Sequence, residues 1–367
     1  MSRDNNFLGF NDFIWFNGVV EDRQDPQKLG RVRVRTLGIH TQDKTVLPTE
    51  DLPWSQCILP VTSAGISGLG QSPSFLVEGT WVFGYFRDGN DCQEPMILGS
   101  LPGKPSELSS PSKGFYDPNG IYPRYKDEVD VNRLAVNGLE PHLSLELRKL
   151  SRVTGIPTAD FDLVSLQDHV SSEVAASDGD TWSQPTIPYS AVYPYNHVYE
   201  SESGHIKEYD DTKGSERIYE SHRTGTSYEI DSQGTKTDIV KGDHYNIVYG
   251  KSQALIEGKS DLTIGGRHKL YINKDGALDN HYDIQVGPNA NINIQVDKGN
   301  LNLVVKDGTM NTNVNGDYNM KVNGNYNLDV RGNLSETVSG TKTSNTTKSV
   351  NHRGQTFTVT ANRIDLN

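Results

Sequence analysis

The chain has 367 residues, of which 35 are Lys or Arg and 47 are Asp or Glu, giving a formal net charge of −12. This acidic excess argues against a protein that mainly grips nucleic acid or anionic lipid, because both need clustered positive charge. Only 34% of the residues are hydrophobic and 35 are glycine, which favours a thin, repetitive or elongated architecture. The sequence predicts neither a membrane-spanning helix nor a signal peptide.

The N-terminal part predicts short β-strands separated by Gly, Pro and Asp turns. Arginine and apolar or Thr side chains alternate over 30–37, which is typical of a half-buried strand. Further strands are expected at 14–21, 55–61, 80–87 and 95–101. We expect these strands to close into a small Greek-key barrel of the oligonucleotide/oligosaccharide-binding (OB) type, because closure leaves no free edges.

The middle of the chain is rich in Ser, Pro and Asp. Helical spacing is seen for Leu143, Leu147 and Leu150, and more loosely for Phe161, Val164 and Val174. This pattern predicts a flexible linker with one or two short helices. The expected domains are therefore a barrel at 1–103, a linker at 104–195, and a neck with a needle at 196–367.

From residue 200 onward the composition shifts to Gly, Asn, Thr and Val, and an eight-residue repeat begins. Most repeats carry a β-branched residue two positions before a glycine. These pairs are Val240 and Gly242, Val248 and Gly250, Ile256 and Gly258, Val314 and Gly316, Val322 and Gly324, Val330 and Gly332, and Val338 and Gly340. The phase slips between Gly266 and Gly308, where a bulged insertion is expected at 273–283.

The even period of the repeat places its apolar residues on one face of a strand every time. Val314, Tyr318 and Met320 then lie on one side with Gly316, and polar residues take the other side. A single such strand can neither bury its apolar face nor pair its edges. Three chains wound together meet both needs, and glycine suits the corner where the backbone turns. The sequence therefore predicts an all-β protein with a C-terminal intertwined triple-stranded β-helix, a homotrimeric prism.

Several motifs resemble the central tail spike of contractile-tailed bacteriophages. Asp25-Pro-Gln-Lys-Leu-Gly-Arg-Val-Arg and Phe86-Arg-Asp-Gly-Asn-Asp-Cys-Gln-Glu-Pro are similar to its OB domain. Glu202-Ser-Gly-His and the Val-x-Gly octapeptides are similar to the neck and needle of that family and of VgrG-type secretion spikes. The resemblance covers residues 1–135 and 182–367.

The resemblance implies a trimeric, membrane-puncturing spike in the tail baseplate of the virion, assembled in the host cytoplasm. Its OB domain is expected to dock on a ring-shaped baseplate hub protein, and its needle to transmit contraction force to the host outer membrane. No cofactor, metal or nucleic acid is expected. The alternatives are the spike of a type VI-like secretion or contractile injection system and a trimeric receptor-binding fibre.

The best-known members of this family carry a lysozyme domain between barrel and needle, whereas the interval here is short and rich in Pro and Ser. Glu140, Glu146, Asp160 and Asp162 are the candidate carboxylates, but too little chain surrounds them to build a glycosidase cleft. We therefore expect no catalytic residues and no enzyme activity. A spike with residual peptidoglycan hydrolase activity is the alternative.

The arginines of the alternating strand, Arg31, Arg33 and Arg35, invite comparison with a nucleic-acid-binding face of an OB barrel. The net charge argues against that function. We interpret them as a solvated strand face or as part of the surface that docks on the hub.

The remaining candidates for chemistry are histidines and cysteines. His197, His205 and His222 lie near the neck without the spacing of metal ligands. Cys57 and Cys92 are predicted to be small, buried residues of the barrel rather than a disulfide.

Near the C-terminus, the last histidine is His352, so the His-x-His pair with which some related spikes hold an iron ion is missing. The prism is expected to end bluntly and to expose apolar residues and unpaired backbone. A small conical cap protein of the PAAR-repeat type is expected to bind there. The residues expected to bind it are Arg363, Ile364, Asp365, Leu366 and Asn367.

Overall fold

The chain forms two compact units, Met1–Leu270 and Tyr271–Asn367. The computed structural model describes residues 14–71, 74–124, 126–136, 173–177, 179–183, 185, 189–273, 276 and 281–364. In these ranges the regular structure is nearly all β, with one α-helix of four residues, α1 (Arg133–Val136). None of the helices described is long and apolar enough to cross a bilayer. The predicted all-β class is confirmed.

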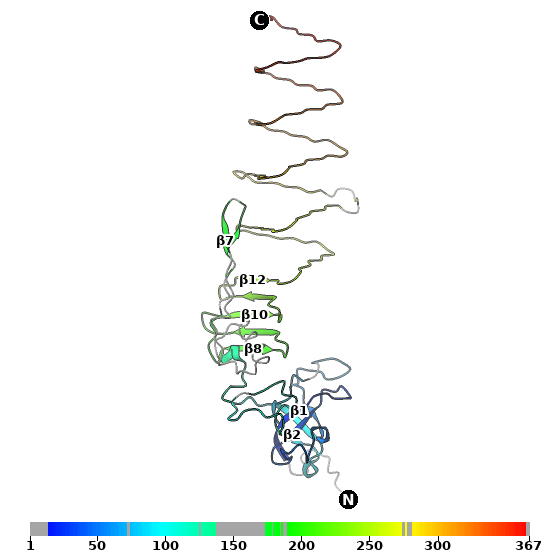
Figure 1. Cartoon of the computed structure of the whole chain (residues 1–367), viewed down its shortest axis with the longest axis vertical. Helices are drawn as coiled ribbons and strands as arrows, with labels where there is room; N and C mark the ends of the chain where they lie inside the picture. Colours follow the sequence, from blue (N-terminus) through cyan, green and yellow to red (C-terminus); the bar gives the residue numbers. More distant parts are fainter. Residues whose placement is uncertain are drawn as a thin grey trace. The chain divides into compact units, whose positions relative to one another are not determined.

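The N-terminal strands close into a barrel in the order β1-β2-β3-β5-β4. Figure 1 labels β1 and β2 of this barrel. The strands are β1 (Ile14–Asp22), β2 (Val32–Thr36), β3 (Trp54–Cys57), β4 (Trp81–Phe86) and β5 (Pro95–Ser100). Single turns of 3₁₀-helix lie at Thr49–Asp51 and Gly89–Asp91. The five strands and their closure match the sequence prediction, although β3 ends four residues earlier than the predicted boundary of 61.

The barrel is filled by a compact apolar cluster. Its buried members are Phe16, Val20, Val32, Val34, Val82, Phe86 and Ile97. Both cysteines are free thiols that pack against this cluster while remaining partly exposed. Gly84 lies where β4 shifts register against β5, and a Cβ there would overlap the carbonyl oxygen of Met96. Closure of the barrel therefore requires glycine at this position.

The second part of the same unit is a five-stranded antiparallel sheet in the order β12-β11-β10-β9-β8. Its strands are β8 (Asn196–Glu200), β9 (Ile206–Asp210), β10 (Arg217–Ser221), β11 (Ser227–Ile230) and β12 (Lys236–Ile239). Leu134 of α1 is fully buried against Ile206 and Tyr219 of this sheet. We refer to this sheet as the neck sheet.

Part of the expected linker contains a small hairpin instead of a helix. Strands β6 (Glu173–Ala175) and β7 (Thr181–Ser183) pair with each other, so Val174 lies in a strand and not in the helix suggested by its spacing. Thr263 Oγ1 donates a 2.8 Å hydrogen bond to the carbonyl of Ala175. The helix expected around 143–150 lies outside the described residues.

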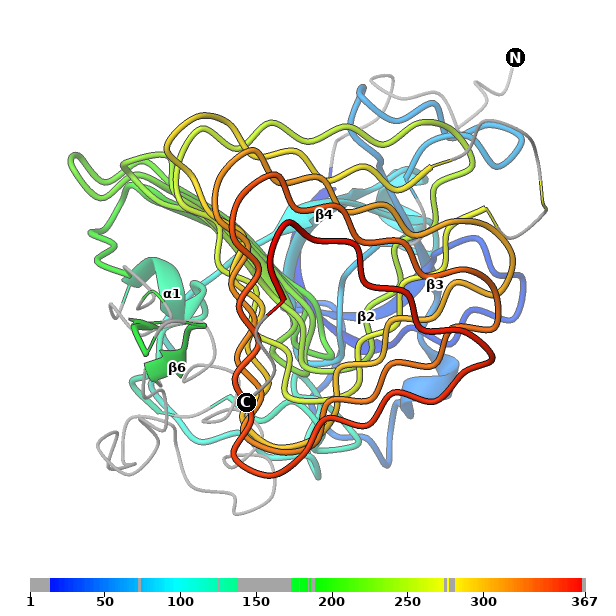
Figure 2. The ribbon, with the colours of Figure 1, turned by 90° about the horizontal axis from the view of Figure 1, so that it is seen from above.

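The octapeptide region has extended backbone with bends at regular intervals. Bends fall at the repeat glycines, including Gly316, Gly324, Gly332 and Gly340. In the second unit, the chain winds as an open coil whose successive turns lie over one another (Figures 1 and 2). Where residues 241–364 are described, they form no strand pairing, and one backbone–backbone hydrogen bond occurs, from Gly276 N to Asn273 O.

Candidate interaction surfaces

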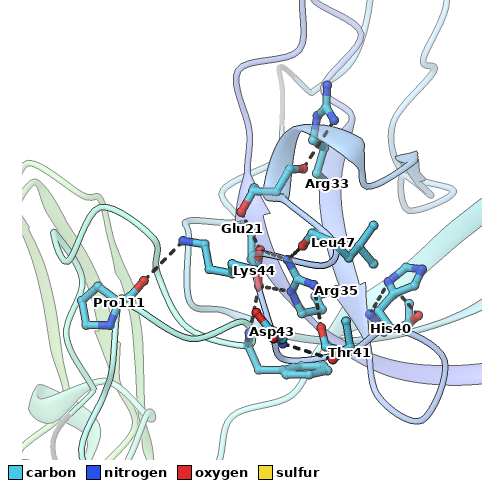
Figure 3. A network of polar contacts seen from close by, with 12 residues as sticks. Glu21, Arg33, Arg35, His40, Thr41, Asp43, Lys44, Leu47 and Pro111 are labelled. Carbon is cyan, nitrogen blue, oxygen red and sulfur yellow. Dashed lines mark hydrogen bonds and ion pairs between the residues drawn. The ribbon is translucent and has the colours of Figure 1, made fainter.

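A buried ion pair between Glu21 and Arg35 lies at the centre of a polar network beside the barrel (Figure 3). The two side chains are fully buried and form two hydrogen bonds, at 2.7 Å and 3.0 Å. Arg35 also donates to the carbonyls of Thr41 and Leu47, at 2.7 Å and 2.8 Å. Thr49 Oγ1 donates to Glu21 at 2.8 Å. Both buried charges are therefore paired and hydrogen-bonded, as burial in a low dielectric requires.

This pair corrects our interpretation of the arginine stripe as a solvated or hub-docking face. Arg35 is 0% exposed. Arg31 pairs with Asp25 at 2.7 Å, and this hydrogen-bonded pair holds the pKa of the Asp25 carboxyl well below its usual range. Arg33 lies over the Trp54 ring, 4.5 Å from its centroid. The guanidinium groups are thus bound within the barrel domain, which argues further against a nucleic-acid face.

The first part of the expected linker packs on the barrel. The backbone N–H of Phe115 donates to Glu21 Oε1 at 2.8 Å. Gly114 lies directly against the Arg35 side chain, where a Cβ would overlap the arginine. Lys44 donates to the Pro111 carbonyl at 3.3 Å (Figure 3). Residues 111–115 therefore complete the barrel domain instead of forming a free tether.

An aromatic cluster lies on the outer surface of the barrel, on β1 and β4. Trp15 stacks on Phe83 with ring centroids 5.2 Å apart and meets Tyr85 edge-on at 5.7 Å. Trp15 is 51% exposed. Exposed aromatic residues of this kind are enriched in protein–protein interfaces.

An arginine and a pair of aromatic rings connect the barrel domain with the neck sheet and its first loop. Arg23 forms two hydrogen bonds with the Glu202 carboxylate, at 2.8 Å and 2.9 Å, and an ion pair with Glu78 at 3.3 Å. Nearby, Phe75 meets Tyr199 edge-on at 5.2 Å. These contacts join the barrel to the neck sheet independently of the linker.

The buried face of the neck sheet holds two carboxylates around one guanidinium. Arg217 pairs with Glu208 and, at 2.9 Å, with Glu229. Its guanidinium also lies 4.8 Å from the centroid of the Tyr189 ring. Burial raises the pKa of both Glu208 and Glu229 above the usual value, against the opposing effect of Arg217.

The repeat residues identified in the sequence lie at the bends or next to them. Other parts of the same chain do not cover their side chains. The β-branched members are between 41% and 62% exposed. They are Val240, Val248, Ile256, Val314, Val322, Val330 and Val338. Tyr318 and Met320 are also exposed, at 66% and 58%.

Known proteins share both sequence and domain content with this chain. Residues 38–184 match the family described as the Gp5 N-terminal OB domain. Protein Gp5 of Vibrio phage KVP40 is 40% identical over 260 residues, which cover 66% of this chain and 61% of that protein. The pre-baseplate central spike protein Gp5 of Enterobacteria phage T4 is 47% identical over 119 residues, 31% of this chain and 20% of that protein.

The chain is similar to the Gp5 proteins of two phages, one of them named as a pre-baseplate central spike protein. This confirms the resemblance seen in the sequence motifs. The matched regions cover less than two thirds of either Gp5 relative, 61% and 20%. The match to the Gp5 OB domain begins within the barrel and extends beyond residue 103, the expected end of the barrel.

Within the described part of the chain, the residues considered for catalysis or metal binding do not come together in one site. Glu140, Glu146, Asp160 and Asp162 lie outside the described residues, as do Asp365, Leu366 and Asn367. His205 and His222 approach each other, with ring centroids 4.6 Å apart. In the described ranges, no group of three or more His, Cys, Asp or Glu residues has the arrangement of a metal site.

The sequence reasoning missed the aromatic cluster and the role of Glu21. Trp15, Phe83 and Tyr85 lie in predicted strands, where alternation alone assigns Trp15 to the outer face, but the pairing of β1 with β4 brings the three together. Glu21 lies at a register shift between Val20 and Asp22. No sequence signal marked this shift.

Proposed function

We propose that three copies of this chain form the central, mechanical spike of a contractile phage tail. The barrels dock on the ring-shaped hub of the baseplate, and the octapeptide regions intertwine as a triple-stranded β-helix. Sheath contraction drives this needle into the host outer membrane. The protein is assembled in the host cytoplasm and resides in the virion.

The observation that carries the proposal is the uncovered octapeptide region. Its apolar residues recur on one face, and its extended backbone forms no ladder within the described part of the chain. Burying one Val or Leu side chain contributes about 1.5–3 kcal/mol. Unpaired extended backbone also presents edges to any matching strand. Two further copies with the same period supply both the apolar cover and the missing hydrogen-bond partners.

The barrel supplies the attachment surface in this proposal. The exposed Trp15 and its stacked neighbour Phe83 support docking of a protein partner, because aromatic anchors carry much of the binding energy in interfaces. The contacts of Arg23 with Glu202 and Glu78 support a direct path for force from barrel to neck sheet.

The proposal includes a cap protein of the PAAR type at Arg363–Asn367 and assigns no catalytic step to the chain. Ile364, which is 51% exposed, is the described apolar residue that such a cap would cover. A peptidoglycan-clearing assay tests the second part, and clearing by the purified chain would contradict it.

Sedimentation of the full chain, combined with SDS gel electrophoresis before and after heating, tests the trimer. We expect a trimer that survives cold SDS, because interlocked chains cannot unravel one at a time. A folded monomer would exclude the proposed needle. Trp15→Ala should remain trimeric and lose binding to the hub protein, which separates docking from assembly.

A further inference from the structure

A cleft lies on the outside of the barrel, between β1, β4 and the segment that follows β5. Its volume is about 420 Å³, within the range of about 300–1,000 Å³ typical of small-molecule sites. Asn17 of β1 and Trp81 of β4 line it together with Phe115, Tyr116 and Glu107. The cleft therefore presents three aromatic rings beside polar side chains.

Phe115 is held at this cleft in a strained conformation. Its φ of 70° lies in the left-handed region, where a bulky residue is a genuine outlier. The hydrogen bond from its N–H to buried Glu21 and the packing of Gly114 on Arg35 fix this backbone. Strained residues of this kind cluster at ligand-binding sites and persist only where the surroundings enforce them. The buried ion pair thus serves to present the Phe115 ring.

Several polar groups of the cleft have no partner in the described part of the protein. The side chains of Asn17, Trp81, Ser106, Glu107 and Tyr116 form no hydrogen bond or ion pair there. They supply an amide, an indole N–H, two hydroxyls and a carboxylate, and so include both donors and acceptors.

The cationic side chains near the cleft are already paired with carboxylates, so they would contribute little to the binding of an anionic ligand. Arg124 is bound to Asp130, and Lys104 lies 3.8 Å from Asp127. The free groups of the cleft include one carboxylate, which disfavours an anionic ligand.

We propose that this cleft binds a short, neutral saccharide. The faces of Trp81, Phe115 and Tyr116 suit the apolar C–H faces of sugar rings, while amide, carboxylate and hydroxyl groups suit sugar hydroxyls, each of which both donates and accepts. A wholly apolar ligand would leave these polar groups unpaired, at a cost in binding. A site with such groups selects for a ligand that carries matching hydroxyls.

Titration of the full-length protein with chitotriose and maltotriose, followed by saturation-transfer NMR and calorimetry, tests this proposal. We expect saturable binding of at least one of them, weakened by about tenfold or more in Trp81→Ala and in Phe115→Ala. Tyr209→Ala changes an aromatic residue of the neck sheet that is 46% exposed and lies outside the cleft lining. It is the matched control and should bind as the wild type does. Asn17→Ala changes an exposed side chain and keeps the test valid if Trp81→Ala does not fold.

The proposal is overturned if the folded wild type binds neither sugar, or if binding survives both Trp81→Ala and Asn17→Ala. Stronger binding of a proline-rich peptide than of either sugar would also overturn it and assign the cleft to a protein partner. Sedimentation of the same samples reports the trimer separately, so failure of sugar binding and failure of the proposed needle are distinguishable.

Discussion

The backbone N–H of Phe115 lies 2.8 Å from Glu21 Oε1 and donates to it, although 94 positions separate the two residues. This hydrogen bond ties a segment beyond the last barrel strand to the buried ion pair of Glu21 and Arg35. Loss of the Glu21 charge should therefore affect both the barrel and the segment that covers it.

Glu21→Gln should destabilise the barrel by about 3–5 kcal/mol, because it leaves Arg35 as an uncompensated buried charge. Chemical denaturation followed by tryptophan fluorescence measures the change. Glu94→Gln is the control, since its pair with Arg87 is exposed at 43% and 48% and should contribute less than about 1 kcal/mol. Equal midpoints for the two variants would show that the buried pair does not stabilise the barrel.

The neck sheet should lose stability as the pH rises above the ordinary glutamate value of 4.5. Burial raises the pKa of Glu208 in the folded state, so folding favours its protonated form. That contribution is complete below the unfolded pKa and is lost as the pH passes through the raised folded pKa. Among the charged groups near Glu208, the Arg217 guanidinium opposes this rise in pKa, and the Asp210 carboxylate adds to it.

Melting temperatures measured between about pH 4 and pH 8 test whether the neck sheet loses stability with rising pH, which is the direction that the raised pKa of Glu208 requires. Glu208→Gln should flatten the dependence, whereas Glu220→Gln on the exposed face of β10 should leave it unchanged. A neck that becomes more stable towards pH 8 would contradict the assignment of the raised pKa to Glu208.

Gly324→Val should block trimer assembly, and Asn325→Ser should be nearly silent. Within one chain, no atom lies within 4 Å of a Cβ added at Gly324, and no positive φ is recorded there. Any loss of assembly in sedimentation velocity must therefore come from neighbouring chains. If Gly324→Val sediments as a normal trimer, the proposed corner is not crowded by other copies.

Gly308→Ala separates backbone strain from crowding. Its φ of +131° is strained for any residue with a Cβ, so the substitution should cost about 1–3 kcal/mol in the chain's own conformation. We expect a lower melting temperature with the trimer retained at low temperature. An unchanged melting temperature would show that this backbone relaxes freely.

Leu134→Ala should destabilise the neck sheet by about 2–5 kcal/mol, because Leu134 is fully buried against Ile206 and Tyr219. Val129→Ala, at a position 39% exposed, is the control and should change little. Limited proteolysis and thermal melting measure both effects. Similar melting temperatures for the two variants would exclude a packing role for α1.

The barrel was predictable because alternating residues and turn signals reflect backbone geometry directly. The same alternation failed at Arg35, where a register shift beside Glu21 lets consecutive residues of β1 turn inward. Val19, Val20 and Glu21 are all buried, and Arg35 finds its counter-charge there. A two-residue period contains no information about such a bulge.

The cleft could not be predicted, since it combines residues from β1, β4 and a later segment. The positive φ of Phe115 is imposed by Glu21 and by the contact of Gly114 with Arg35, both distant in sequence. The octapeptide bends, in contrast, follow a local pattern and coincide with the glycines that mark the period.

In the proposed needle, the even length of the repeat makes needle length a modular property of the gene. Duplication or loss of one whole octapeptide keeps every later apolar residue on its original face, because side chains alternate with a period of two. An insertion of an odd number of residues would invert all the faces that follow it. Needles of different reach can therefore arise by gain or loss of whole repeats, without redesign of the barrel or the neck sheet.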